Sequence, residues 1–145
     1  MQPVKISYAT PQMIKFGNRL GLDLNNCSIS VASAMLDDLI SREFWEAVVA
    51  PCSANQINFA SSLGINVEGL SKRVASAMIG DILHRMNMEA IIYLGLKPGI
   101  SVKRKNDIIK RVFIISSISD DGTVYFKGGN GKRAWARNLI KVGGI

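Results

Sequence analysis

An internal duplication constrains the fold of this chain more than any other feature of its sequence. The stretch ATPQMIKFGNRLGLDL (9–24) aligns without a gap with CSANQINFASSLGINV (52–67), at an offset of 43 residues. The run VASAM recurs at the same offset, starting at Val31 and at Val74. Many matches at one constant offset indicate two tandem copies of a single structural unit.

Each copy has the pattern of two helices joined by a short extended turn. Thr10 and Ser53 are candidate N-cap residues, because their side-chain oxygens can accept a hydrogen bond from the first helical turn. Gly21 and Gly64 are placed to end the first helix, because glycine adopts the left-handed conformation without steric cost. In the second helix apolar residues recur every four positions. The sequence therefore predicts a helix-turn-helix repeat that is present twice.

The helical domain is expected to cover residues 1–94, with repeat 1 over about 9–40 and repeat 2 over about 52–83. The stretch EFWEAVVA (43–50) is expected to continue or restart a helix until a proline stops it. The last helix is expected to extend toward Tyr93. Together these elements predict a small helical bundle.

The helical copies also resemble known modules. The pattern S/T-x-x-Q-I-x-F-A-x-x-L-G-I resembles short helical modules of bacterial and phage DNA-metabolism proteins. It resembles more distantly the helix–extended–helix plan of SAP-type DNA-binding modules. The helices of this chain depart from the SAP pattern because they are not basic. We therefore interpret the helical domain as a packing scaffold or a protein-interaction surface.

The last third of the chain has the pattern of short strands and turns. The stretch NDIIKRVFIISSI (106–118) is apolar and β-branched and predicts a buried strand. Asp121 and Gly122 predict a hairpin, because Asp-Gly supplies the positive φ of a tight turn. Residues 137–139 predict a short helical turn before a final strand. Four or five such strands favour a small closed barrel over residues 95–145.

Three stretches of this domain, KPGISVKRK, VFIISSISDDGTVYF and RAWARNLIKV, resemble SH3-like barrels of the Tudor, KOW or PWWP kind. In those families an opening P-G-x-x-V strand, a D-G hairpin and a closing W-x-x-x-x-L pattern recur. The predicted fold class is therefore α+β, with an N-terminal bundle of two tandem helix-turn-helix repeats followed by a C-terminal SH3-like β-barrel. We expect the barrel to pack against the last helix near residues 88–94.

Positive charge is concentrated in the same third of the chain. Between Lys97 and Val142, eleven lysines and arginines face three aspartates, a net charge of +8, whereas the remaining chain has a net charge of −1. Such an asymmetry points to a polyanionic partner. Aromatic residues alternate with these charges and could stack on exposed bases. The predicted nucleic-acid-binding residues are Lys103, Arg104, Lys105, Lys110, Arg111, Lys127, Lys132, Arg133, Trp135, Arg137 and Lys141.

The sequence contains no recognisable catalytic or metal-binding pattern. His84 is the single histidine, and Cys27 and Cys52 lack CxxC spacing, so neither a metal site nor a disulfide framework is expected. Asp38 and Asp81 occupy the same position of the two repeats, and a helix-surface or capping role explains them more simply than a catalytic pair. We therefore expect a protein that is not an enzyme and that needs no cofactor.

The predicted partner is nucleic acid, with DNA favoured over RNA, and a protein could bind to the helical repeats. The alternative function is that of a protein-binding adaptor, or of a phage-type inhibitor that docks on a nucleic-acid-handling enzyme. The N-terminus lacks the pattern of a signal peptide, and the apolar stretches are too short to span a bilayer. We therefore expect no membrane partner and a location in the cytoplasm, or in the host cytoplasm if the protein is encoded by a phage.

Overall fold

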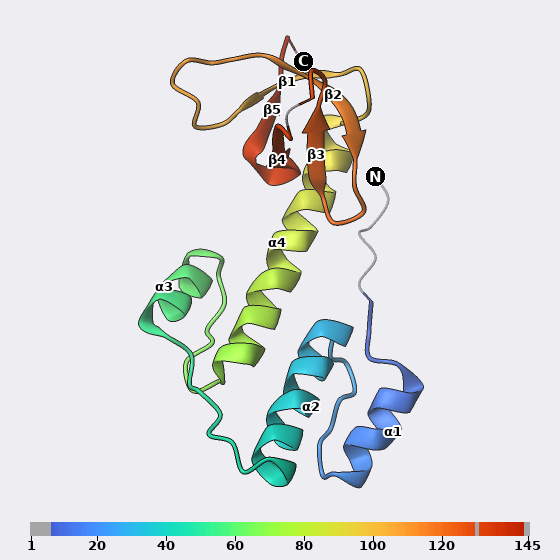
Figure 1. The fold of residues 1–145 in the computed structure, drawn as a ribbon, viewed down its shortest axis with the longest axis vertical. Helices are drawn as coiled ribbons and strands as arrows, with labels where there is room; N and C mark the ends of the chain where they lie inside the picture. The colour runs from blue at the N-terminus through green and yellow to red at the C-terminus, as the bar shows by residue number, and fades with distance from the viewer. Residues whose placement is uncertain (1–6, 130, 144–145) are drawn as a thin grey trace. The chain divides into compact units, whose positions relative to one another are not determined.

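The computed structural model describes residues 7–129 and 131–143 (Figure 1). It is an α+β protein in which four helices precede a five-stranded antiparallel sheet. The chain separates into a helical unit, Lys5–Ile82, and a second unit that includes Leu83–Ile145. Within the described ranges, no helix combines the length and the apolar character that crossing a bilayer would require.

The helices of the helical unit start at the residues that the sequence predicts. They are α1 (Pro11–Arg19), α2 (Ile29–Phe44), α3 (Ala54–Ser62) and the first part of α4 (Lys72–Leu94). Thr10 accepts a hydrogen bond from the backbone of α1, and Ser53 forms a full capping box at the start of α3, which confirms both predicted N-caps. α1 and α3 begin 43 residues apart, and so do α2 and α4.

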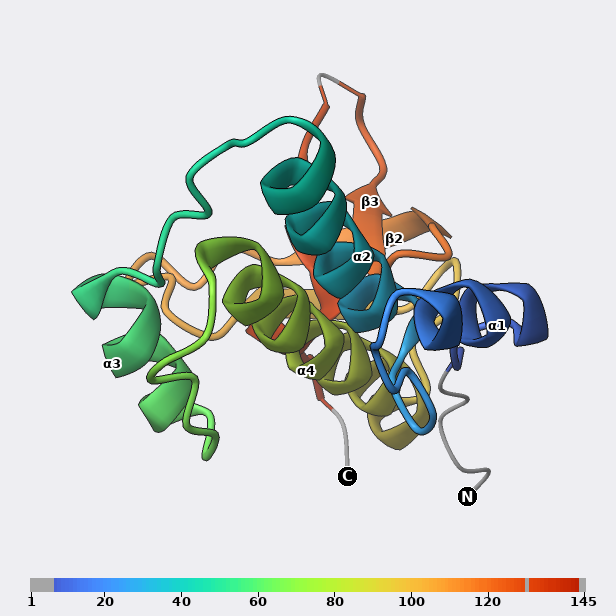
Figure 2. The same ribbon diagram turned by 90° about the horizontal axis from the view of Figure 1, so that it is seen from below.

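The helices α2 and α4 lie side by side (Figure 2), and a reciprocal pair of side-chain hydrogen bonds joins them. The hydroxyl of Ser28, the N-cap of α2, donates to Asp81 of α4, and the hydroxyl of Ser71, just before α4, donates to Asp38 of α2. Arg73 adds an ion pair to Asp38 at 3.1 Å. Each carboxylate therefore lies at the N-terminus of the other copy's second helix, where the helix dipole favours negative charge. These contacts explain why both copies carry an aspartate at this position.

The cores of the two copies use different pairs of side chains at equivalent positions. In the first copy, Gly17 of α1 lies so close to Leu24 that a Cβ atom at residue 17 would be 2.7 Å from Leu24 Cδ1. In the second copy the equivalent residues are Ala60 and Val67, and both are fully buried. A larger residue on the helix is thus matched by a smaller one in the turn, as dense core packing requires.

We expect Gly17→Ala to lower the free energy of unfolding by about 1–3 kcal/mol, because the added methyl group overpacks the core. Combining it with Leu24→Val should restore most of that loss, because the double variant reproduces the pair found in the second copy. Urea unfolding of the wild type, both single variants and the double variant would measure the coupling between the two sites. Simply additive effects would show that these positions do not compensate for each other.

The prediction of a helix over residues 43–50 is wrong beyond Phe44. α2 ends there, Trp45 is its C-cap, and Glu46 adopts a positive φ of 50°, which interrupts the helical path. Val48 is 94 % exposed, so no apolar contact supports a further helical turn. The last helix, by contrast, extends to Leu94, in agreement with the predicted extension.

The second unit contains the sheet and the C-terminal part of α4. Its elements are β1 (Ser101–Arg104), β2 (Phe113–Ile118), β3 (Thr123–Phe126), β4 (Arg133–Trp135), the 3₁₀ helix η1 (Ala136–Asn138) and β5 (Leu139–Lys141). The strand order is β4-β3-β2-β1-β5, and all neighbours are antiparallel. Ala90, Ile91 and Leu94 of α4 pack against the core of the sheet, as the sequence predicts for this stretch of helix. The core residues are Leu96, Val102, Ile115, Val124, Phe126, Ala136 and Leu139.

Asn87 joins α4 to two turns of this unit. Its side chain is only 2 % exposed, and its Oδ1 atom accepts hydrogen bonds from the backbone N–H of Arg137 (3.1 Å) and from Arg137 Nη1 (3.2 Å). The β2–β3 turn also lies against Asn87, because a Cβ atom at Gly122 would be 2.5 Å from Asn87 Cβ. Gly122 has the positive φ expected of the predicted Asp-Gly hairpin, which is confirmed.

The prediction of one buried strand over residues 106–118 is wrong for its first half. β2 begins only at Phe113, and the preceding residues form a loop in which Ile108 is 95 % exposed. The carboxylate of Asp107 accepts hydrogen bonds from the backbone N–H groups of Ile109 and Arg111, which competes with strand formation. Lys110 has a φ of 57°, which no strand can accommodate.

Candidate nucleic-acid interface

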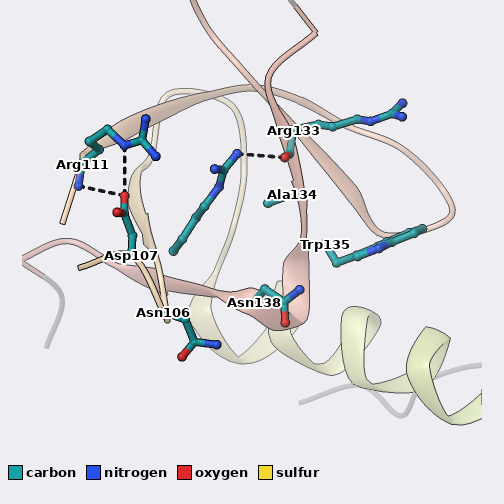
Figure 3. Close-up of a pocket in the computed structure, with 8 residues that line it drawn as sticks. Asn106, Asp107, Arg111, Arg133, Ala134, Trp135 and Asn138 are labelled. Carbon is teal, nitrogen blue, oxygen red and sulfur yellow. Dashed lines mark hydrogen bonds and ion pairs between the residues drawn. The ribbon is translucent and has the colours of Figure 1, made fainter. Parts of the chain in front are cut away.

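A basic groove of about 500 Å³ lies on the second unit (Figure 3). It is formed by the end of β1, the β1–β2 loop, β4 and η1, and we refer to it as the arginine groove. Arg104, Asn106, Asp107, Arg111, Arg133, Ala134, Trp135 and Asn138 line it.

Two stacked aromatic rings and a backbone carbonyl hold Arg104 at one side of the arginine groove. Phe113 and Phe126 stack with their ring centres 4.4 Å apart, and the guanidinium carbon of Arg104 lies 5.2 Å and 5.8 Å from the two centres. Its Nη2 atom donates to the carbonyl oxygen of Arg133 at 3.2 Å. Because a guanidinium has five N–H donors, this geometry fixes the plane of the group while leaving other donors for a ligand.

Asp107 positions Arg111 at the opposite side. The carboxylate accepts hydrogen bonds from both the backbone N–H and the Nε atom of Arg111, each at 3.2 Å (Figure 3). Desolvation raises the pKa of the Asp107 carboxyl, but hydrogen bonds from Arg111 and from the backbone of Ile109 outweigh it, so the pKa lies below its ordinary value. Asp107 is therefore ionised at neutral pH, and the arginine groove is lined by three arginines and one carboxylate.

Trp135 presents an aromatic surface beside these charges. Its side chain is 41 % exposed, whereas Phe126 is buried in the core and Tyr125 is half-buried. The guanidinium carbon of Arg137 lies 5.2 Å from the centre of the Trp135 ring. Burial lowers the pKa of the Arg137 guanidinium, and its hydrogen bond to Asn87 fixes its position. Of Tyr125, Phe126 and Trp135, the tryptophan is thus the best placed to stack on a base.

The remaining predicted site residues lie outside the lining of the arginine groove. Lys103 precedes Arg104 on the same strand, so the two side chains point to opposite faces of the sheet. Lys105 and Lys110 are exposed in the β1–β2 loop. The structure brings together Arg104, Arg111, Arg133 and Trp135, with Arg137 against the Trp135 ring. Five of the predicted binding residues are exposed but do not line the arginine groove: Lys105, Lys110, Lys127, Lys132 and Lys141.

Sequence reasoning missed Asn106, Asp107 and Asn138 as lining residues. Asp107 was counted only as a charge, although its spacing of four residues from Arg111 is a signal for such a pair. The other two are amides in turns, and no sequence pattern places them beside the arginines.

The chemistry of the arginine groove is that of anion binding. Guanidinium groups form paired, charge-assisted hydrogen bonds with phosphate oxygens, and an exposed indole offers a stacking surface. Across residues 7–129 and 131–143, no group of three or more His, Cys, Asp or Glu side chains is arranged to hold a metal ion. Comparison with known protein families, with curated proteins and with solved structures finds no match for this chain.

Proposed function

We propose that this protein binds nucleic acid through the arginine groove and does not act as an enzyme. The observation that carries this proposal is that Arg104, Arg111 and Arg133 line one groove together with the exposed residue Trp135. Three guanidinium groups can contact successive phosphates, while the indole stacks on a base. DNA is favoured over RNA, because the chain resembles modules of DNA-metabolism proteins.

We also propose that the sheet closes into an SH3-like barrel. In the strand order, β2 and β3 separate β1 from β4, so a flat sheet would hold them about 14 Å apart, more than an arginine side chain spans. Yet Arg104 of β1 donates a hydrogen bond to the carbonyl of Arg133 of β4. A register shift between Ile115 and Ser117 adds a bend to β2. Both observations support a strongly curled sheet.

The helical unit is, in the same proposal, a pair of tandem helix-turn-helix repeats that serves as a scaffold. The matched helix starts and the reciprocal bonds of Ser28 and Ser71 to the opposite copy's aspartate support this assignment. A role as an adaptor or inhibitor that docks on another protein is the second candidate function. It is favoured by the exposed apolar residues Phe44, Trp45 and Val48, which lie at the end of α2 and just after it.

Fluorescence anisotropy with labelled duplex DNA, single-stranded DNA and RNA tests the proposed function. We expect binding whose affinity falls with salt, with a logarithmic slope of about −2.7 on duplex DNA if three phosphates are neutralised at about 0.9 each. A slope near zero would contradict contact with the phosphates. Absence of binding at low salt to all three nucleic acids would reject the function and leave docking on a protein as the remaining candidate.

A further inference from the structure

The β1–β2 loop presents an apolar tip to solvent. Ile108 is 95 % exposed and Ile109 is 75 % exposed, and Val112 on the same loop is also exposed. Exposed aliphatic residues are common singly, but this loop exposes three within five residues. Neither the fold nor the arginine groove uses this surface, because Ile108 and Ile109 belong to neither the core of the sheet nor the groove lining.

The loop is held in a defined shape. Asp107 Oδ1 accepts the backbone N–H of Ile109 at 3.1 Å, while its other oxygen accepts the backbone N–H and the Nε atom of Arg111. A turn hydrogen bond from the Lys110 N–H to the Asp107 carbonyl closes the loop at 3.1 Å. The two isoleucines are therefore displayed on a braced turn that points them away from the sheet core.

Positive charge surrounds the tip. Lys105 and Lys110 are exposed on the loop, and Asp107 and Arg111 connect it directly to the arginine groove. A ligand that covers the tip must therefore carry negative charge and also offer an apolar space that can accept aliphatic side chains. Duplex DNA has both, because phosphates line its grooves and the space between base pairs accepts aliphatic side chains once the stack is opened.

We propose that Ile108 and Ile109 insert as a wedge between base pairs of duplex DNA and bend it, while the arginine groove holds the adjacent phosphates. This inference rests on the proposed function, because the charges provide the binding that the wedge requires. The wedge contributes a distortion of the DNA rather than most of the affinity. A lipid bilayer with anionic headgroups is the other surface that could receive such a tip. We place the wedge on DNA because the adjoining arginine groove carries the proposed nucleic-acid function.

The experiment uses the full chain and a short DNA duplex labelled at its two ends for energy transfer. We expect the wild-type protein to shorten the distance between the two ends of the DNA, which corresponds to a bend of the duplex by about 20° or more. The double variant Ile108→Ser/Ile109→Ser should still bind with an unchanged salt slope but should lose the bend. Val48→Ser is the matched control, because that side chain is 94 % exposed and lies in the helical unit, and its variant should bend DNA like the wild type.

The possible outcomes separate the wedge from the proposed function. Salt-dependent binding of the wild type without a change in energy transfer would reject the wedge and leave the nucleic-acid function intact. A bend that persists in the double variant would also reject it. Binding to phosphatidylserine vesicles that the double variant loses, without bending of DNA, would assign the tip to membranes instead. No binding to any nucleic acid would reject both proposals.

Discussion

Arg133→Glu should lower the affinity for nucleic acid by about ten- to hundredfold at moderate salt. Arg133 lines the arginine groove and is exposed, so the variant should lose the proposed phosphate contact without disturbing the core. A charge-assisted hydrogen bond contributes about 1.5–3 kcal/mol, and the introduced carboxylate repels the phosphates in addition. The logarithmic salt slope should also decrease in magnitude by about 0.9 for the lost contact. Anisotropy titrations of both proteins over a salt series measure the two quantities.

Lys97→Glu is the control for this experiment because it makes the same change in net charge. Lys97 is exposed and precedes β1, whereas the arginine groove lies at the end of that strand. If the groove is the binding site, Lys97→Glu should reduce affinity much less than Arg133→Glu. Equal losses would mean that the protein responds to overall charge and that the groove has no special role. Circular dichroism would verify that both variants keep the wild-type fold.

Gly122→Ala should destabilise the second unit by about 3 kcal/mol or more. Gly122 has a φ of 91°, where an alanine is strained by about 1–3 kcal/mol. The new methyl group would also lie 2.5 Å from Asn87 Cβ, so helix and turn must separate, at a further cost of about 1–3 kcal/mol. Separation would weaken the hydrogen bonds between Asn87 and Arg137. Urea unfolding in a Trp45→Phe background would measure this effect, because Trp135 then reports on the second unit alone.

Gly99→Ala separates the two causes. Gly99 has nearly the same φ, 93°, but nothing lies within 4 Å of a Cβ atom at that position. Its variant should therefore show only the backbone strain, about 1–3 kcal/mol. If both variants lower the free energy of unfolding by the same amount, the contact between Gly122 and Asn87 contributes nothing to the loss of stability.

Most of the features that the sequence predicted correctly have local causes. Thr10 and Ser53 cap helices because their hydroxyls reach the first turn of the same helix. Asp121 and Gly122 form a hairpin because the turn depends on residues within the turn. The α+β class followed from the change in periodicity between the two parts of the chain. Each of these features depends on residues within a few positions of one another, so the composition and spacing of the sequence were sufficient to predict it.

The candidate site was predictable only in part. The charge count pointed to the third of the chain that carries the arginine groove, but it could not select among the eleven cations there. Arg104, Arg111 and Arg133 come together because β1, the β1–β2 loop and β4 meet at one groove, and Asp107 bends that loop away from the predicted strand. These are contacts between residues far apart in sequence, for which spacing carries no information.

The two copies show most clearly where the sequence alone was insufficient. The duplication continues through SREFWEAVVA (41–50) and HRMNMEAIIY (84–93), which share R-x-x-x-E-A followed by two β-branched residues. Both stretches have the same helical pattern, yet only the second is helical throughout. Ala90 and Ile91 pack on the core of the sheet, whereas Val48, which is equivalent to Ile91, is exposed. Sequence determined where each helix begins, through its cap. Tertiary structure decided how far the second helix of each copy continues, because the last turns of a helix are stable in water only when their apolar face is buried.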